Sequence, residues 1–326
     1  RALPNRPGCE PPRGMGPCRR HPARPGPLFS AALLCGIFRA CALPLRAADR
    51  EAPAAAGDKL TRFVVISIQR SGTGWLDSTL DFHPCISMAN EIFAGDGTEG
   101  FWSSAKRQRA IDIFFDEGMK MRSDADAAFV KSIPGRYQDA YNKVKARRGV
   151  WVEQENKTGD VRGFDWKING GVFETWPWFE QYCKKHGVKI IWLQRQQYLR
   201  QFVSSAAMKR NNSDHPRSQR RAATMRDDKV TLSVNQMMYF INQWEEQNAH
   251  MKYLLFKAKS AGVQTLSLLY EDMLMAPTIL DDVAAFVLNG SACAAPQHRK
   301  PEKPWFPRIH TGTLKDLIEN WSEVRA

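Results

Sequence analysis

Apolar residues along this chain form short unbroken runs that alternate with longer amphipathic segments. Five runs are rich in β-branched residues and fit strands that are buried on both faces of a sheet. They cover residues 63–68, 85–88, 161–168, 188–193 and 264–270. The segments between them space apolar side chains three or four residues apart, as an α-helix does. This alternation predicts an α/β fold in which a central parallel sheet has helices on both faces.

The clearest amphipathic segment covers residues 234–257 and predicts a helix with one core-facing stripe. That stripe consists of Met237, Met238, Ile241, Trp244, Met251 and Leu255. Residues 209–229, in contrast, are basic, lack apolar periodicity and contain a proline, so they predict a mobile solvated loop or a lid over a ligand. No aromatic residue alternates with the basic residues of this loop, which argues against nucleic-acid binding.

The first apolar run leads into FVVISIQRSGTGWL at residues 63–76. Two glycines in this turn can take positive φ and let a ligand approach the backbone closely. A helical pattern then begins, so the free N–H groups of a helix N-terminus lie beside the turn and favour an anion. The turn therefore predicts a phosphate or sulfate site, or else it is only a tight connection. Its candidate ligands are Arg70, Ser71, Gly72, Thr73, Gly74 and Trp75.

A second candidate site follows the apolar run at 188–193. Arg195 stands at the exit of this strand, and Ser204 lies nine residues later on the predicted helix. A guanidinium and a hydroxyl placed in this way can converge on one phosphate. For Arg195 alone, a surface ion pair is the competing interpretation.

The two segments resemble the motifs of sulfotransferases that use 3′-phosphoadenosine 5′-phosphosulfate (PAPS). RSGTGWL is similar to the 5′-phosphosulfate loop K/R-S-G-T-T-W-L, with Gly74 in place of the second threonine. The nine-residue spacing of Arg195 and Ser204 is similar to the 3′-phosphate motif of bacterial and carbohydrate-type members. The resemblance implies that both segments hold the PAPS donor.

Two later segments extend the resemblance. Residues 266–287 look like the strand, YEDL sequence and helix near the end of sulfotransferase domains, where Tyr270 and Glu271 are expected to be structural. Residues 308–324 are similar to the closing basic segment that covers the nucleotide, with Arg308, His310, Thr311 and Lys315 as candidate contacts. The order of the four motifs implies a three-layer, P-loop-like sulfotransferase domain at residues 59–326.

Sulfuryl transfer to a hydroxyl needs a base, because the acceptor proton must leave as the oxygen–sulfur bond forms. Glu91 follows the run at 85–88 and should lie at the carboxyl edge of the sheet, where α/β proteins bind ligands. It matches the glutamate that is the usual candidate base in carbohydrate-type sulfotransferases, while Arg70 stabilises the developing charge. His83 is the rival base, or a turn residue. Lys167 could reach the donor or acceptor, or point into water.

The resemblance implies transfer of the sulfuryl group from PAPS to a hydroxyl, with a glycan as the expected acceptor. A sulfolipid or a small alcohol is the alternative acceptor. A nucleotide kinase is disfavoured, because G-x-x-x-x-G-K-S/T needs a lysine where Trp75 stands. A non-catalytic nucleotide-binding protein would keep the loop and lose the base. The seven histidines are scattered without zinc-ligand spacing, so no metal is expected.

Residues 1–58 differ from the rest, with ten prolines, no lysine, and nine arginines against four acidic residues. This composition predicts a disordered or targeting segment. The apolar stretch at 27–45 follows arginines and resembles a signal peptide or membrane anchor, although Arg39 interrupts it. A plastid transit peptide is the alternative. The remaining residues carry a net charge of +8, from 38 basic and 30 acidic side chains, which suits a doubly phosphorylated donor.

Four N-x-S/T sequons agree with a Golgi or secretory location. They begin at Asn156, Asn211, Asn289 and Asn320. The domain contains only Cys85, Cys183 and Cys293, so it can form at most one internal disulfide and has no disulfide framework.

Overall fold

The computed structural model describes residues 60–83, 85–93, 102–115, 124–133, 160–211, 229–289, 291 and 312–325. All of them belong to the compact unit Ala52–Ala326. The predicted targeting segment, the apolar stretch at 27–45 and residues 212–228 of the predicted basic loop lie outside the described residues.

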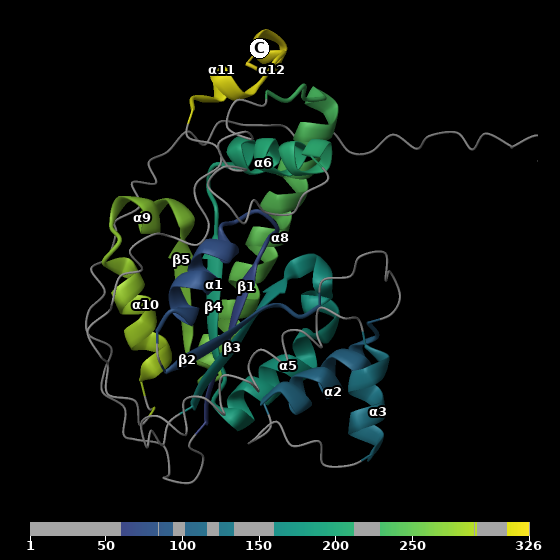
Figure 1. Cartoon of the computed structure of the whole chain (residues 1–326), viewed down its shortest axis with the longest axis vertical. Helices are drawn as coiled ribbons and strands as arrows, with labels where there is room; N and C mark the ends of the chain where they lie inside the picture. The colour runs from purple at the N-terminus through teal and green to yellow at the C-terminus, as the bar shows by residue number, and fades with distance from the viewer. Residues whose placement is uncertain are drawn as a thin grey trace, which may run out of the picture. The chain divides into compact units, whose positions relative to one another are not determined.

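Five strands form one sheet with the order β2-β3-β1-β4-β5, and every neighbouring pair is parallel. They are β1 (Leu60–Ser67), β2 (Ile86–Glu91), β3 (Asp160–Lys167), β4 (Lys189–Gln194) and β5 (Thr265–Leu269). Each predicted run overlaps one strand. Because β1 occupies the centre, its loop has neighbours on both sides at the carboxyl edge of the sheet (Figure 1).

Helices cover both faces of the sheet, as the alternating pattern predicts (Figure 1). One face packs against α1 (Thr73–Asp81), α9 (Tyr270–Met275) and α10 (Ile279–Leu288). The other packs against α2 (Ser104–Phe115), α5 (Val172–His186), α6 (Tyr198–Asn211) and α8 (Val234–Ser260). The three-layer α/β fold with a parallel sheet is therefore confirmed. The remaining elements are α3 (Asp124–Ser132), η2 (Ile168–Gly170), α11 (Leu314–Leu317) and α12 (Trp321–Val324).

The stripe predicted on residues 234–257 is only partly core. Met237, Trp244, Met251 and Leu255 are buried, whereas Met238 is 47% exposed. Positions 237, 244, 251 and 255 fall on one side of a 3.6-residue helix, and 238 turns away from that side. The prediction for Met238 was wrong. Met238 directly follows Met237 in the sequence, but one step along the helix carries its side chain away from the side that faces the sheet.

Two buried arginines at the amino ends of β1 and β3 hold the end of α2. Arg62 Nε donates to the carbonyl of Phe115 at 3.3 Å, and Arg162 Nη1 donates to that of Phe114 at 3.1 Å. Cations near a helix C-terminus satisfy its free carbonyl groups and complement its dipole. These contacts fix α2, in the segment after the strand that carries Glu91.

Candidate active site

The turn after β1 has the backbone that an anion-binding loop requires. Arg70 takes a φ of 65° and Gly72 a φ of 91°, so the chain reverses within a few residues. Gly72 is the N-cap of α1, and no side chain caps the helix there. The first N–H groups of α1 therefore face the turn without a side-chain acceptor, as an anion site needs.

The position of Tyr270 also requires glycine at residue 72. A Cβ atom at this position would lie 2.3 Å from Cδ2 of Tyr270, which follows β5. The same tyrosine ring packs edge-to-face with Trp75, with centroids 6.2 Å apart. Tyr270 thus fixes the turn from the side of β5, a structural role that agrees with the expectation for this residue.

The residues expected to hold the two anions meet around Arg70. The Arg70 guanidinium donates to Ser204 Oγ from Nε at 3.0 Å and from Nη2 at 2.8 Å. Arg195 Nη1 donates to the Arg70 carbonyl at 3.0 Å, and its guanidinium lies 4.8 Å from the centre of the Tyr270 ring. The exits of β1 and β4 and the second turn of α6 therefore form one cationic cluster.

Glu271 binds the backbone between β4 and α6, next to this cluster. Its two carboxylate oxygens accept hydrogen bonds from the backbone N–H groups of Gln196 and Gln197, each at 3.1 Å. These groups precede the first residue of α6, so Glu271 occupies N–H groups that an anion could otherwise use. A phosphate near α6 therefore cannot use the N–H groups of Gln196 and Gln197 while Glu271 holds them.

Gln201 on α6 also holds the turn after β1, and sequence reasoning missed it. Its side chain is 1% exposed and its Nε2 donates to the Gln69 carbonyl at 2.6 Å, and more weakly to Ser71 Oγ at 3.5 Å. It lies one helical turn before Ser204 on α6. The position on the same helix face as Ser204 was the available signal for this residue.

Lys167 is buried and reaches the loop, so the alternative in which it points into water was wrong. The side chain is 6% exposed, and Nζ donates to Ser67 Oγ at 3.0 Å, to the Thr73 hydroxyl and to Asp165. Strands β1 and β3 place Ser67 opposite Lys167 in register. Sequence reasoning missed both partners. Ser67 meets Lys167 only through the pairing of β1 with β3, whereas Asp165 lies two residues earlier on the same face of β3, a spacing that the sequence itself shows.

Glu91 and His83 lie at opposite ends of β2. Glu91 is the last residue of β2 and pairs with Asp165 on β3 next to an irregularity in the register, at the same edge as the loop. His83 precedes β2, is 4% exposed, and accepts from the Cys85 N–H at 3.2 Å through Nδ1. Six strand residues span about 20 Å, so His83 is a turn residue remote from the anion loop.

The last predicted contacts, Arg308, His310 and Thr311, lie outside the described residues. Chain residues 312–325 are described, and Lys315 is exposed there on α11. Arg200 on α6 donates to the carbonyl of Gly312 at 3.1 Å. The C-terminal segment therefore begins against the helix that carries Ser204.

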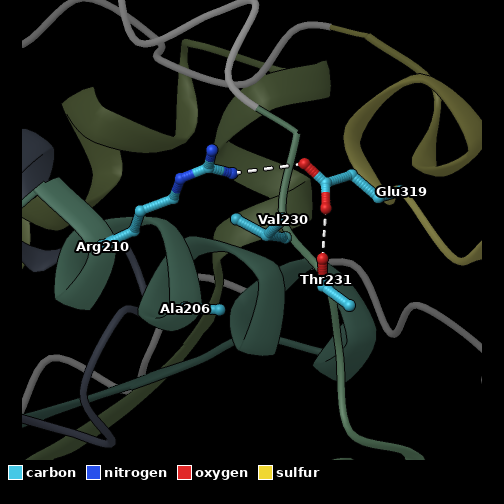
Figure 2. A pocket seen from close by; sticks show the side chains of 5 residues that line it. All are labelled: Ala206, Arg210, Val230, Thr231 and Glu319. Carbon is cyan, nitrogen blue, oxygen red and sulfur yellow. Dashed lines mark hydrogen bonds and ion pairs between the residues drawn. The ribbon is translucent and has the colours of Figure 1, made fainter.

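A cavity of about 320 Å³ lies where α6 meets the C-terminal segment, and none of the predicted site residues lines it (Figure 2). Figure 2 shows Arg210 and Thr231 directed at the carboxylate of Glu319. Arg210 lies 3.4 Å from this carboxylate, and Thr231 donates to it. The polar groups of the cavity thus pair with one another, and we describe this contact as the C-terminal clasp, made of Arg210, residues 229–232 and residues 317–320.

No family model matches the chain, and no curated protein matches it. Among solved structures, the chain is similar to a sulfotransferase from Alicyclobacillus acidocaldarius, with 15% identity, a TM-score of 0.35, and coverage of 75% of this chain and 87% of the other. It is also similar to the sulfotransferase domain of the Synechococcus PCC 7002 olefin synthase, with 12% identity, a TM-score of 0.32, and coverage of 79% and 88%. Likenesses of this size do not decide an activity.

Within the described residues, no helix is both long and apolar enough to cross a bilayer. Nor do the side chains described there gather three histidine, cysteine or acidic groups as metal ligands would be gathered.

Proposed function

We propose that the chain is a sulfotransferase that moves the sulfuryl group of PAPS to an acceptor hydroxyl. The observation that carries the proposal is the contact between the two strand exits, where Arg195 Nη1 lies 3.0 Å from the Arg70 carbonyl. One nucleotide with phosphates at both its 3′ and 5′ positions can use cations and helix N-termini that stand this close.

The residues divide the donor between them. The loop from Arg70 to Trp75 binds the 5′-phosphosulfate through its backbone N–H groups, and Arg195 and Ser204 bind the 3′-phosphate. The Arg70 guanidinium donates twice to Ser204 Oγ, which leaves the Ser204 hydroxyl hydrogen able to donate to the 3′-phosphate. Arg308, His310 and Thr311 close over the nucleotide in this proposal.

The transfer step uses Glu91 as the general base. The acceptor oxygen attacks sulfur, its proton passes to the Glu91 carboxylate, and the sulfur–oxygen bond to the 5′-phosphate breaks. Adenosine 3′,5′-bisphosphate leaves with the electron pair of that bond. Arg70 and the loop N–H groups stabilise the negative charge that builds on the leaving phosphate.

The proposed acceptor is a glycan hydroxyl. Support comes from the pattern around Glu91, from the nine-residue Arg195–Ser204 spacing, and from the leader-like stretch at residues 27–45. A sulfolipid or a small alcohol offers the same nucleophile. An acceptor screen with labelled PAPS and mass detection of sulfated products distinguishes these classes.

We also propose a secretory or Golgi location, with residues 27–45 as the leader or membrane anchor and a plastid as the alternative. The support is the order of basic and then apolar residues before residue 45, together with the four sequons. Fluorescent tagging and protease protection of the full chain test this location, and a cytosolic signal would contradict it.

The donor is tested by thermal unfolding with two nucleotides. Adenosine 3′,5′-bisphosphate should raise the melting temperature as its concentration exceeds Kd, because it binds only the folded state. ATP with Mg²⁺ should give a much smaller shift in melting temperature. A kinase or a general nucleotide-binding protein would instead be stabilised by ATP with Mg²⁺. Equal shifts with both nucleotides would contradict the proposal.

A further inference from the structure

A buried ion pair lies directly beneath the anion loop. Lys167 and Asp165, both on β3, are 6% and 3% exposed, and their charged groups are in contact. Asp165 Oδ1 has no hydrogen-bond partner among the residues that the structure describes. Burying two charges costs desolvation energy that their attraction offsets only in part, so stability alone explains the pair poorly.

All the hydrogen atoms of the Lys167 ammonium are engaged inside the protein. The group carries three N–H donors and no acceptor. The three donors meet Ser67 Oγ at 3.0 Å, the Thr73 hydroxyl oxygen and the Asp165 carboxylate. While these contacts hold, Lys167 has no hydrogen left for a bound anion.

The contact with Lys167 determines where the Thr73 hydroxyl can donate. Its oxygen accepts from the ammonium, so its own hydrogen must point elsewhere. Thr73 is the first residue of α1, next to the uncapped N-terminus at Gly72. The hydrogen is thus available to an anion held by the loop, and the neighbouring positive charge polarises the hydroxyl into a stronger donor.

We propose that the Asp165–Lys167 pair acts through Thr73. The pair orients the Thr73 hydroxyl hydrogen toward the 5′-phosphosulfate of the donor, and Lys167 is a positioning residue that does not touch the transferred group. Asp165 keeps the ammonium in place and neutralises it, so that Arg70 supplies the charge of the loop. This inference rests on the proposed function, because the donor is what the hydroxyl binds.

A double-mutant cycle tests the inference, since residues that act in series do not give additive losses. Removing one charge alone would strand the other in the interior, so the pair is removed together as Asp165→Asn with Lys167→Met. This pair-neutral variant is combined with Thr73→Val. Titration calorimetry measures Kd for adenosine 3′,5′-bisphosphate, after thermal unfolding has shown that each variant is folded.

We expect Thr73→Val and the pair-neutral variant each to weaken binding by about 10-fold, the size of one hydrogen bond to a charged group. The combined variant should be no weaker than the poorer of the two. Thr73→Ser keeps the hydroxyl and should retain wild-type affinity. Ser204→Ala is the matched control at the other phosphate, where its loss should multiply with that of the pair-neutral variant.

Two results would overturn the inference. If the losses from Thr73→Val and the pair-neutral variant multiply, Lys167 contacts the anion directly. If the folded pair-neutral variant binds as tightly as the wild type, the pair has only a structural role. Failure of the proposed function is a separate result, because wild-type protein would then not bind the bisphosphate at all.

Discussion

At the residue scale, Gly72 carries two constraints that arise from different parts of the chain. Its φ of 91° comes from the turn itself, and the space at its Cα is taken by Tyr270, almost 200 residues later. The first constraint can be anticipated from the spacing of small residues in RSGTGWL. The second requires β5 to lie beside the loop.

Replacing Gly72 by alanine should therefore cost more than the backbone strain alone. Gly262 has a similar φ of 88° with nothing within 4 Å of its missing Cβ, so Gly262→Ala measures the strain by itself. We expect about 1 kcal/mol for Gly262→Ala and about 2 kcal/mol more for Gly72→Ala, because the Tyr270 ring must move. Urea unfolding measures both; equal losses would mean that Tyr270 yields freely.

Replacing the proposed base Glu91 by glutamine should remove the proton acceptor and leave the proposed donor site intact. We expect kcat to fall by about 100- to 10,000-fold, while Kd for adenosine 3′,5′-bisphosphate stays near the wild-type value. His83→Asn at the other edge of the sheet is the comparison and should leave turnover unchanged. Near wild-type turnover of Glu91→Gln would exclude Glu91 as the base.

At the element scale, the ends of helices are tied to distant strands by charged side chains. Glu271 after β5 accepts from the N–H groups that precede α6, and Arg62 and Arg162 donate to the last carbonyls of α2. Lys189 at the start of β4 donates to the final turn of α10, at 2.8 Å to the Phe286 carbonyl. Such contacts place each helix against the sheet and complement its dipole.

Lys189 gives this arrangement a pH dependence. Burial lowers the pKa of Lys189 to about 8, from 10.5 for an ordinary lysine. Between these values the unfolded chain binds more protons than the folded protein, so the free energy of unfolding should rise with pH from about 8 to 10.5. The contribution is about 3 kcal/mol at most, since the helix carbonyls favour the charged form.

Unfolding of Lys189→Met measured over the same pH range isolates this contribution. The difference in unfolding free energy between wild type and Lys189→Met should shift in favour of the wild type as pH rises through this window. Lys252→Met, on the exposed side of α8, is the matched control and should show a constant difference. A constant difference for Lys189→Met would mean that its ammonium is fully compensated.

At the scale of the whole domain, the C-terminal clasp joins residues 317–320 to residues 229–232. Val230 and Ile318 form a parallel bridge, and the Asn320 side chain both donates to and accepts from the backbone of Leu232, at 2.8 and 3.0 Å. The clasp holds the end of the segment that begins against α6 at Gly312. It therefore links the last part of the chain to the helix that carries Ser204.

Asn320 is also the first residue of a sequon, and its Nδ2 atom is the one that a glycan would modify. Because Nδ2 donates to the Leu232 carbonyl and to Glu323, a glycan there would disrupt the clasp, whereas the exposed Asn289 is not constrained in this way. Protein made in a secretory host should carry no glycan at Asn320. Glycopeptide mass spectrometry measures this, with Asn289 as the comparison; modified Asn320 in folded protein would contradict it.

Local pattern was sufficient to predict the strands, the helices on both faces of the sheet and the glycine turn between β1 and α1, because burial and turn formation select residues within a few positions of one another. Local pattern could not predict the contacts between residues far apart in the sequence. These are the contacts of Lys167 with Thr73, Arg195 with Arg70, and Tyr270 with Gly72. Each depends on strand order and register, and a shift of one residue in register turns every side chain to the other face of the sheet.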